Sequence, residues 1–500
     1  MHCPARLLVA LSFALGAAVS QAQQTTLPPS VSAALARAGL PESSLSAMVV
    51  AVPLQDASVP LNQGPTRADA QHHGDLPPAR LAYRVDAAMN PASVMKLVTT
   101  YASLQTLGGN FRWRTQVLRD GRLLPQGVLD GNLIIQGGGD PYLTYPRVQE
   151  LLAQVQAAGI RHIRGDLIID RSMFKLSERD PAAFDGKPSR PYNASPDGLL
   201  LNFKVLEFNF KPISGGRAEV AMQPPLAGVQ IPSTVATSSG PCGDASVALG
   251  ADLSDPLNIA FNGSYPVSCG RTSVYYAYYA QPQAYALRAL TGMWLAAGGS
   301  INGNTREGLT PRSAKRILTY RSPALRDVIV HINKYSNNVM AQQLFLSAPS
   351  LSGRKRRPST WAQSQKWVGS WWQRHMHGSR APVLENGSGL SRKERISAAA
   401  LSTLLQHAAH SPEFDDFAQS LAIAGVDGTV AKMRVRDADN SALGQARLKT
   451  GTLDTAKAVA GYVIGRSGQL YSVVGMVNHP RAPAAQEALD ALLDWTARDQ

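Results

Sequence analysis

The sequence predicts an α+β protein in which an antiparallel sheet flanked by helices is interrupted by inserted β-rich domains. Three observations support this fold class. A long helical pattern runs over 92–107, with a proline near its start and two glycines after its end. Residues 111–270 instead form short alternating strand patterns separated by Gly and Pro. The chain ends with two strand patterns and a helical pattern, at 458–464, 470–477 and 484–498.

The remaining elements fit the same class. Two short strands are expected near the start, at 47–54 and 82–88, and helical patterns return at 283–297 and 323–347. The final hairpin turns at 465–468, and the last helix is expected to lie across its two strands. The expected sheet therefore combines strands from both ends of the chain.

The composition is that of an ordinary soluble protein. Of the 500 residues 44% are hydrophobic and 17% are charged, which is enough chain for two or three packed domains. A mainly disordered, collagenous or many-helix membrane protein is therefore excluded. Lys and Arg exceed Asp and Glu by 14, so an anionic partner is favoured: nucleic acid, a lipid head-group surface or an acidic polymer.

Residues 1–22 have the pattern of a secretory signal peptide. Arg6 precedes an apolar run at 7–19, and Ser20-Gln21-Ala22 supplies small residues for cleavage. The run is too short to span a bilayer core of about 30 Å as a helix. We therefore expect export and cleavage after Ala22, which disfavours nucleic acid as a partner and favours a cell-wall polymer or peripheral contact with a membrane.

Cysteine usage agrees with export. Cleavage removes Cys3 and leaves Cys242 and Cys269, an even pair in an oxidising compartment. We expect a disulfide between them; two buried free thiols are the alternative.

The tetrad Ser93-Val94-Met95-Lys96 supplies a candidate nucleophile and base. Positions i and i+3 share a helix face, so the amine can reach the hydroxyl. A lysine acts as a base near neutral pH only if burial or a second cation lowers its pKa. The helix N-terminus also favours a developing anion beside Ser93. The same spacing occurs at Ser172/Lys175 and Ser352/Lys355, but neither serine opens a long apolar helix.

Two further elements follow in order along the chain. Ser336-Asn337-Asn338 lies between apolar helical stretches, whereas the rival Ser300-Ile301-Asn302 has no such helix before it. Lys449-Thr450-Gly451 leads into the final hairpin. On an edge strand its backbone can pair with an extended peptide, Lys449 can face a substrate carboxylate, and Gly451 can let the ligand backbone come close.

The order S-x-x-K, S-x-N, K-T-G resembles the serine acyltransferases that include penicillin-binding proteins and β-lactamases. The long separation of Ser93 from Ser336 is similar to that of the class C low-molecular-mass penicillin-binding proteins, the D-alanyl-D-alanine carboxypeptidase/endopeptidase family. This resemblance implies a β-lactamase/transpeptidase-like catalytic domain at 23–110 and 271–500. Residues 111–270 are then the inserted region, with two nested domains.

Other stretches resemble motifs of that family. They are the turn at 136–141 (Q-G-G-G-D-P), the segment Tyr192-Asn193-Ala194 with Asn202-Phe203, and 386–392 (N-G-S-G-L-S-R). Two residues depart from the family pattern: Asn386 stands where Asp is usual, and Gln342 where Glu is usual. We expect both to affect local loop and helix contacts more than the reaction.

The resemblance implies a periplasmic D,D-peptidase that acts on peptidoglycan stem peptides and is acylated by β-lactams. Ser93 attacks the penultimate D-Ala carbonyl and Lys96 takes its proton. Ser336 and Lys449 pass the proton to the leaving amine, and Asn338 holds Lys96 and the substrate amide. The N–H groups of Ser93 and Thr452 form the oxyanion site, and Thr450 and Gly451 complete the substrate-binding strand.

Competing functions require other residues. An α/β-hydrolase needs G-x-S-x-G, which is absent, and a zinc peptidase needs a glutamate beside its histidines, which His375-x-His377 and His407-x-x-His410 lack. We therefore predict no metal and no cofactor. A β-lactamase and a non-catalytic peptidoglycan-binding protein remain as alternatives, to be separated by acyl-enzyme turnover and by penicillin labelling.

Overall fold

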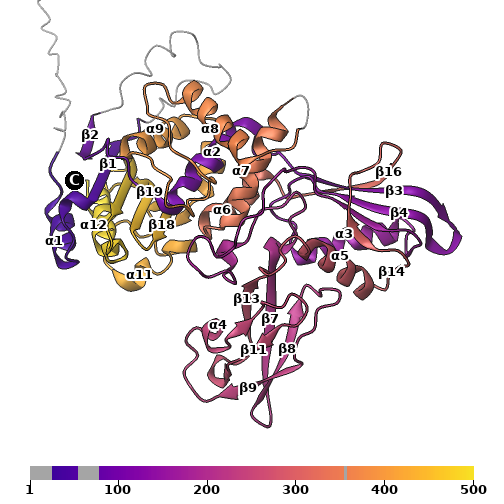
Figure 1. Ribbon diagram of the computed structural model, residues 1–500. Coiled ribbons are helices and arrows are strands. Elements are labelled where there is room, and N and C mark those ends of the chain that lie inside the picture. Colours follow the sequence, from indigo (N-terminus) through magenta and orange to yellow (C-terminus); the bar gives the residue numbers. More distant parts are fainter. Residues whose placement is uncertain (1–24, 54–77, 354–356, 500) are drawn as a thin grey trace, which may run out of the picture.

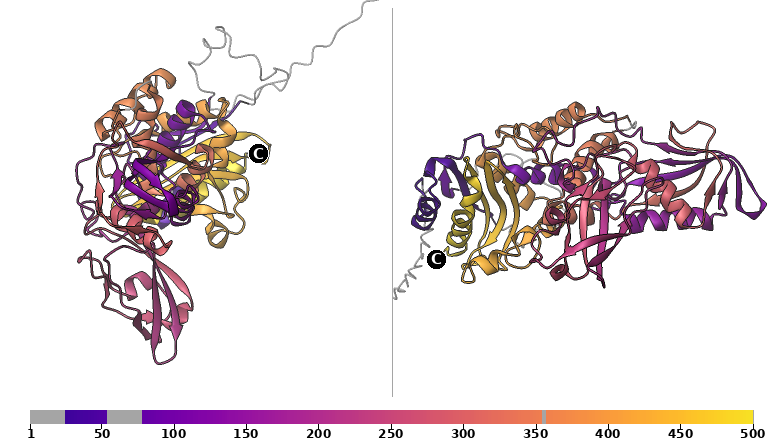
Figure 2. Two further views of the ribbon diagram at one scale, coloured as in Figure 1. Left: turned by 90° about the vertical axis from the view of Figure 1, so that its right-hand side faces the viewer. Right: turned by 60° about the horizontal axis from the view of Figure 1, so that its bottom comes forward.

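The computed structural model describes residues 25–53, 78–353 and 357–499. The signal peptide expected at 1–22 lies outside these residues. Three larger β-sheets with flanking helices make up the described structure (Figure 1), and they confirm the α+β class. One sheet belongs to a body built from both ends of the chain, and the other two belong to segments inserted into it (Figure 2).

The first sheet has six antiparallel strands and unites the two ends of the chain. Its order is β17-β18-β19-β20-β1-β2, so the N-terminal β1 lies between β20 and β2. The expected final hairpin is present as β19 and β20. The strands are β1 (Leu45–Ala51), β2 (Ala79–Tyr83), β17 (Ala422–Ile423), β18 (Ala446–Leu453), β19 (Ala456–Ile464) and β20 (Leu470–Asn478).

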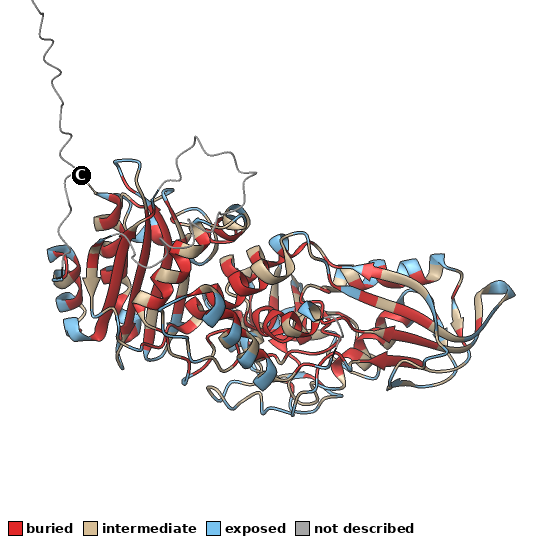
Figure 3. Ribbon diagram, turned by 90° about the horizontal axis from the view of Figure 1, so that it is seen from above, coloured by how far each residue is buried: buried red, intermediate tan, exposed pale blue. Residues whose placement is uncertain are grey.

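Both faces of this sheet are buried (Figure 3), because helices cover each of them. Alternate residues of β19 show the division: Val459 and Val463 pack with α1 (Pro29–Arg37) and α12 (Gln486–Ala497), while Ala460 and Tyr462 face the opposite helical layer. The opposite layer contains α2 (Lys96–Leu107), α6 (Leu325–Lys334), α7 (Asn338–Ser352), α8 (Trp361–His375), α9 (Ala398–Ala409) and α10 (Phe414–Gln419). The short α11 (Met433–Arg436) contributes Met433 to the α1/α12 side.

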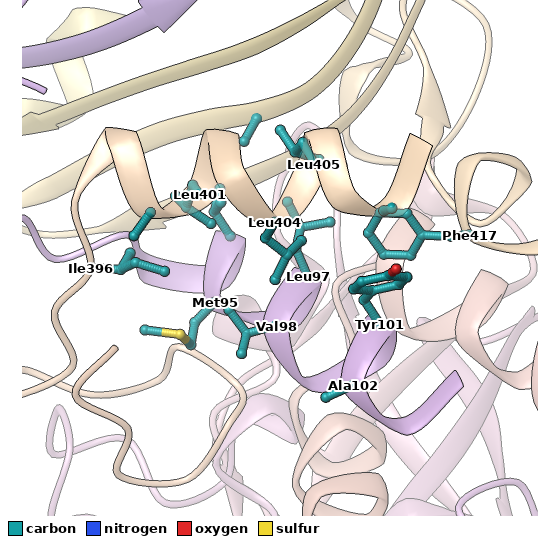
Figure 4. Close-up of a cluster of buried hydrophobic side chains, with 14 of the residues drawn as sticks. Met95, Leu97, Val98, Tyr101, Ala102, Ile396, Leu401, Leu404, Leu405 and Phe417 are labelled. Atoms are coloured by element: carbon teal, nitrogen blue, oxygen red, sulfur yellow. The ribbon is translucent and has the colours of Figure 1, made fainter. Parts of the chain in front are cut away.

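The helix expected at 92–107 forms, and it lies in the centre of the helical layer. Its first turn is a 3-10 turn, Ala92–Met95, which continues into α2. Leu97 and Tyr101 of α2 pack against Leu404 of α9 and Phe417 of α10 (Figure 4). Burial on all sides fixes α2 and therefore fixes the position of the side chains at its start.

The inserted region contains two sheets with a common core. A seven-stranded sheet has the main order β14-β5-β4-β3-β16, with β6 beside β4 and β15 beside β6. A five-stranded sheet, β12-β9-β8-β7-β13, is nested between β6 and β14 in the chain. Helices α3 (Tyr145–Ala157) and α5 (Tyr285–Ala296) and the short α4 (Ala245–Ala248) accompany them. The strands are β3 (Arg114–Leu124), β4 (Val128–Gln136), β5 (His162–Ile163), β6 (Leu167–Asp170), β7 (Val205–Ile213), β8 (Arg217–Gln223), β9 (Thr234–Ser238), β12 (Tyr265–Pro266), β13 (Thr272–Ala277), β14 (Ser300–Ile301), β15 (Thr305–Glu307) and β16 (Lys315–Arg321), with β10 (Ala251–Asp252) and β11 (Ala260–Phe261) forming a separate two-stranded pair.

The expected boundary at residue 270 does not coincide with the end of these sheets. β13 pairs with β7, and β16 pairs with β3 along its whole length. Strands after 270 thus complete the inserted sheets, which sequence patterns could not reveal because β16 finds its partner far back in the chain. We propose that the inserted region ends near residue 321.

One covalent cross-link lies within the inserted region. Cys242 and Cys269 are joined by a disulfide, as expected from their pairing after export. Within the described ranges, no helix is long and apolar enough to cross a membrane.

Candidate active site

The candidate nucleophile Ser93 sits at the start of α2, next to a buried lysine. Asn90 Oδ1 accepts the Ala92 N–H at 2.9 Å and so helps to hold the turn that carries Ser93. Lys96 is the first residue of α2 and is completely buried. Its Nζ lies 2.9 Å from Ser93 Oγ, as the i, i+3 spacing predicts.

Three oxygen atoms surround the amine of Lys96. The Nζ donates to Ser93 Oγ, to Asn338 Oδ1 at 2.6 Å and to the Ser388 carbonyl at 2.5 Å. Burial, together with the nearby cation of Lys449, holds the pKa of Lys96 well below its ordinary value, and Glu394 opposes this shift. The site therefore meets the requirement for a lysine that can act as a base.

The S-x-N element forms the sharp break between α6 and α7. The sequence pattern at 323–347 suggested helix on both sides, and the structure ends the first helix at Lys334. Ser336 has φ +56°, a left-handed conformation that terminates α6. Asn337 then caps α7, because its Oδ1 accepts the Met340 N–H at 3.1 Å. This break points Ser336 and Asn338 to the start of α2.

The third element, Lys449, reaches the same place from β18. Its Nζ donates to Ser336 Oγ at 2.9 Å and to the Thr450 carbonyl at 2.7 Å. Burial lowers the pKa of Lys449 to about 7. The fold thus brings together two serine–lysine pairs, Ser93 with Lys96 and Ser336 with Lys449, and places Asn338 against Lys96.

The strand β18 presents a free edge beside these residues. Its partner β17 pairs with Arg447 and Leu448 alone, so the stretch from Lys449 to Leu453 is paired on the β19 side only. An extended peptide can add to this edge by backbone hydrogen bonds. On β18, Thr450 donates to the Thr429 hydroxyl at 2.7 Å, and Thr452 accepts from Lys457 at 3.1 Å.

Gly451 packs closely against the turn that carries Ser93. A Cβ at this position would lie 2.5 Å from the Pro91 carbonyl and 2.9 Å from the Ser93 nitrogen. The absence of a side chain at Gly451 therefore allows β18 to approach the turn that carries Ser93, and its expected role beside a ligand backbone stays a prediction. Gly389 does the same from the other side, since its Cβ would lie 1.9 Å from the Ala92 carbonyl.

Gln342 and Asn386, the two residues that depart from the family pattern, both contact Ser388, and the Ser388 carbonyl accepts a hydrogen bond from Lys96. Gln342 Nε2 donates to Ser388 Oγ at 3.4 Å. Asn386 Oδ1 accepts the Ser388 N–H at 2.9 Å, and Asn386 Nδ2 donates to the Leu390 carbonyl at 2.8 Å. These contacts are local, as expected, but only Ser388 lies between them and the candidate base Lys96.

Sequence reasoning did not single out Glu394, a buried carboxylate behind this loop. Its Oε1 accepts three backbone N–H groups of the loop, and its charge acts on Lys96. The only available signal was an acidic residue in an otherwise basic stretch, which is ordinarily an exposed position.

The inserted region contributes one wall of the site. Asn338 Nδ2 donates to the Tyr192 carbonyl at 3.3 Å. Asn193 Nδ2 and the Tyr192 hydroxyl in turn donate hydrogen bonds to the Asp185 carboxylate, at 2.8 and 2.7 Å respectively. The Tyr192-Asn193-Ala194 motif therefore contacts the catalytic domain directly. In the G-G-G-D-P turn, burial raises the pKa of Asp140 to about 6, and a Cβ at Gly138 would lie 2.1 Å from the Arg114 carbonyl.

The rival motifs do not form comparable arrangements. Ser172 and Lys175 are both exposed, and Ser352 is exposed on the last turn of α7. Lys355 and most of the basic run at 354–357 lie outside the described residues. Ser300 lies on β14 of the inserted region, where its Oγ contacts His162 Nδ1 at 2.7 Å. In the described part of the chain, no group of three or more His, Cys, Asp or Glu could hold a metal ion.

The two lowered lysine pKa values predict a dependence of stability on pH. Between pH 7, the approximate pKa of Lys449 in the folded protein, and about pH 10, Lys449 binds more protons in the unfolded chain than in the folded chain, and the lowered pKa of Lys96 acts in the same direction. These two lysines therefore make the free energy of unfolding rise with pH. One such lysine contributes at most about 1.4 kcal/mol per pH unit. Lys449→Met is expected to reduce this slope. Urea unfolding of both proteins at several pH values measures the slopes, and equal slopes would contradict a lowered pKa for Lys449.

The sequence is similar to one protein family and to several of its characterised members. A model of the D-Ala-D-Ala carboxypeptidase 3 (S13) family matches residues 79–499. A D-alanyl-D-alanine carboxypeptidase of Actinomadura sp. (strain R39) is 28% identical over 418 residues, which cover 80% of this chain and 76% of that protein. The D-alanyl-D-alanine carboxypeptidase DacB of Haemophilus influenzae is 25% identical over 405 residues, which cover 79% and 82%.

A solved structure shares the fold over almost the whole chain. The crystal structure of penicillin binding protein 4 (dacB) from Haemophilus influenzae superposes with a TM-score of 0.71 at 22% sequence identity, covering 93% of this chain and 99% of that one. This confirms the predicted catalytic fold with inserted β-rich domains.

Proposed function

Because the chain belongs to the D-Ala-D-Ala carboxypeptidase 3 (S13) family, we propose that the two serine–lysine pairs around Asn338 are its catalytic centre. Membership makes the protein a serine D,D-peptidase of the penicillin-binding class. Its substrates are peptidoglycan peptides, and β-lactams are its acylating inhibitors.

Acylation begins at Ser93. Neutral Lys96 takes the proton of the Ser93 hydroxyl while Oγ attacks the carbonyl of the penultimate D-Ala. The negative charge on the carbonyl oxygen is held by the N–H groups of Ser93 and Thr452, which the close approach of β18 at Gly451 brings near each other. Collapse of the intermediate expels the leaving amine and leaves an ester on Ser93.

The leaving amine needs a proton, and the second pair can supply it. Ser336 Oγ lies 2.9 Å from Lys449 Nζ, so a proton can pass from Lys449 through Ser336 to the amine. Asn338 fixes Lys96 through its Oδ1, and its Nδ2 is available to a substrate amide if it gives up the Tyr192 carbonyl. The substrate strand adds to the free edge of β18 at Lys449–Leu453.

The observation that carries this assignment is the paired burial of two lysines, each 2.9 Å from a serine hydroxyl. Burying two amines next to each other opposes stability, because each loses solvation and each repels the other when protonated. A structural role gives no reason to keep such a pair. Proton transfer does, since both pKa values are lowered toward neutral pH.

We also propose a periplasmic location, with export directed by residues 1–22 and cleavage after Ala22. The apolar run at 7–19 and the disulfide between Cys242 and Cys269 support it, because disulfides persist in oxidising compartments. The expectations of peripheral membrane contact and of no nucleic-acid partner belong to this proposal.

Purified cross-linked muropeptides test the substrate assignment directly. Mass spectrometry of the digest is expected to show loss of a terminal D-Ala residue, cleavage of D-Ala-diaminopimelate cross-links, or both. Penicillin is expected to leave an adduct on the Ser93 peptide that decays slowly. If neither muropeptide product forms and hydrolysed penicillin is released rapidly, a β-lactamase would be favoured instead. If there is no adduct and no cleavage, a non-catalytic wall-binding protein would be favoured.

A further inference from the structure

Glu394 is a fully buried carboxylate that holds the loop behind the candidate base. Its Oε1 accepts the backbone N–H groups of Glu385, Asn386 and Gly387 at 3.0, 3.0 and 3.1 Å. Burial raises the pKa of Glu394, whereas the three donors on one oxygen atom and the charge of Lys96 oppose that shift and favour the ionised carboxylate. Its second oxygen, Oε2, is also buried and has no hydrogen-bond partner among the described residues.

The clamped loop touches α2 and the turn before it at three successive residues. The Gly387 carbonyl accepts from Thr99 Oγ1 at 2.6 Å, the Ser388 carbonyl accepts from Lys96 Nζ at 2.5 Å, and Gly389 packs against the Ala92 carbonyl. The position of the Ser388 carbonyl therefore depends on the carboxylate of Glu394. A displacement of the loop would withdraw one of the three acceptors of Lys96.

The groups around Lys96 make the negative charge of Glu394 important. The amine faces Ser93 from the turn before α2, Asn338 from α7, the Ser388 carbonyl from the loop and the cation of Lys449 from β18. Asn386 and Gln342, which flank Ser388, are both neutral. Glu394 brings negative charge to this cluster, and its influence raises the pKa of Lys96 against burial and Lys449.

We propose that Glu394 is a positioning residue of the acylation step, which orients the Ser388 carbonyl toward Lys96 and supplies the counter-charge for the ammonium that Lys96 becomes. The inference rests on the proposed function of Ser93 and Lys96. In the step itself, the O–H bond of Ser93 breaks, its proton moves to Lys96 Nζ, and the Oγ–carbon bond forms. One positive charge then appears in a buried site that already contains Lys449, and the fixed carboxylate offsets it.

The substitution Glu394→Gln removes the negative charge of this side chain but keeps its size and shape. The amide oxygen can still accept the three loop N–H groups, but the negative charge is gone. The pKa of Lys96 should then fall, so the acid limb of acylation should move to lower pH, while a less basic Lys96 should acylate more slowly at high pH. We expect the ratio of wild-type to variant acylation rates to increase with pH, by up to about tenfold for each unit by which the pKa falls.

A matched control comes from the same loop. Glu385 is partly exposed, accepts from Ser391 Oγ at 2.6 Å and pairs with Arg179 at 3.6 Å, so Glu385→Gln removes a carboxylate without removing the clamp. Stopped-flow labelling with a fluorescent penicillin between about pH 5 and pH 9 gives the rate profiles of the wild type and both variants. The profile of Glu385→Gln is expected to keep the shape of the wild-type profile.

The outcomes discriminate between the possibilities. A ratio of the wild-type rate to the Glu394→Gln rate that is the same at every pH would reduce Glu394 to a structural residue and overturn the proposal. An equal change of profile in Glu385→Gln would also overturn it. Labelling of the wild type at a peptide other than that of Ser93 would instead refute the proposed function, and peptide mapping in the same experiment detects this separately.

Discussion

Ser93→Ala is expected to abolish covalent labelling by penicillin and to reduce peptidase activity by several powers of ten. The reason is that Ser93 carries the only hydroxyl within 2.9 Å of Lys96 Nζ among the described contacts of that amine. Without this oxygen no ester can form, and the remaining residues can only bind the substrate. Intact-mass analysis after incubation with penicillin measures the adduct, and peptide mapping locates it.

Two other serines provide internal controls for that experiment. Ser172 and Ser352 fit the same S-x-x-K spacing, but both are exposed. The Ser172→Ala and Ser352→Ala variants are therefore expected to be labelled by penicillin at the wild-type rate. An adduct on a peptide that lacks Ser93, or full labelling of Ser93→Ala, would overturn the assignment of the nucleophile.

Lys96→Arg is expected to lose nearly all acylation, although it keeps the positive charge. A guanidinium remains protonated at any pH the protein survives, so it cannot take the proton of Ser93. The larger group must also fit a completely buried site with three oxygen acceptors. Lys96→Ala is expected to be similarly inactive, and the double variant with Ser93→Ala should be little worse than Ser93→Ala alone, because the two residues act as one unit.

Stability must be separated from chemistry in these lysine variants. Replacing a buried amine can leave a cavity or strain, so thermal unfolding and circular dichroism accompany each rate measurement. The expected result is a folded Lys96→Arg protein that fails to acylate. A Lys96→Arg protein that folds normally and acylates at a rate near that of wild type would exclude Lys96 as the base.

The order and context of three short motifs were sufficient to predict which residues meet. Ser93 and Lys96 could be paired because helical spacing fixes their distance, and Ser336 and Lys449 could be added because their motifs stand in a recurrent order. The helix at 92–107, the final hairpin and the disulfide were predictable for similar local reasons, since caps, turns and cysteine parity are visible in the sequence itself.

Features that depend on distant partners could not be predicted in this way. Residues 315–321 belong to the inserted sheet because they pair with β3, far earlier in the chain, and no local pattern records that pairing. The close packing of Gly451 against the Pro91 carbonyl joins two segments that are far apart in the chain. Glu394 looks like a surface residue until the loop at 385–387 folds over it and gives it three donors.

The pairing of β1 with β20 sets the order in which the molecule can be assembled. Leu45 pairs with Val477, so the central sheet cannot close until nearly the whole chain has been synthesised. The inserted sheets lie between these strands in the chain and have their own core, so they can fold first and bring the distant ends together. Contacts of such long range slow folding. The serine centre needs α2, α7 and β18 together, so we expect it to be completed among the last steps of folding, and we expect a chain truncated before β20 to form no acyl-enzyme.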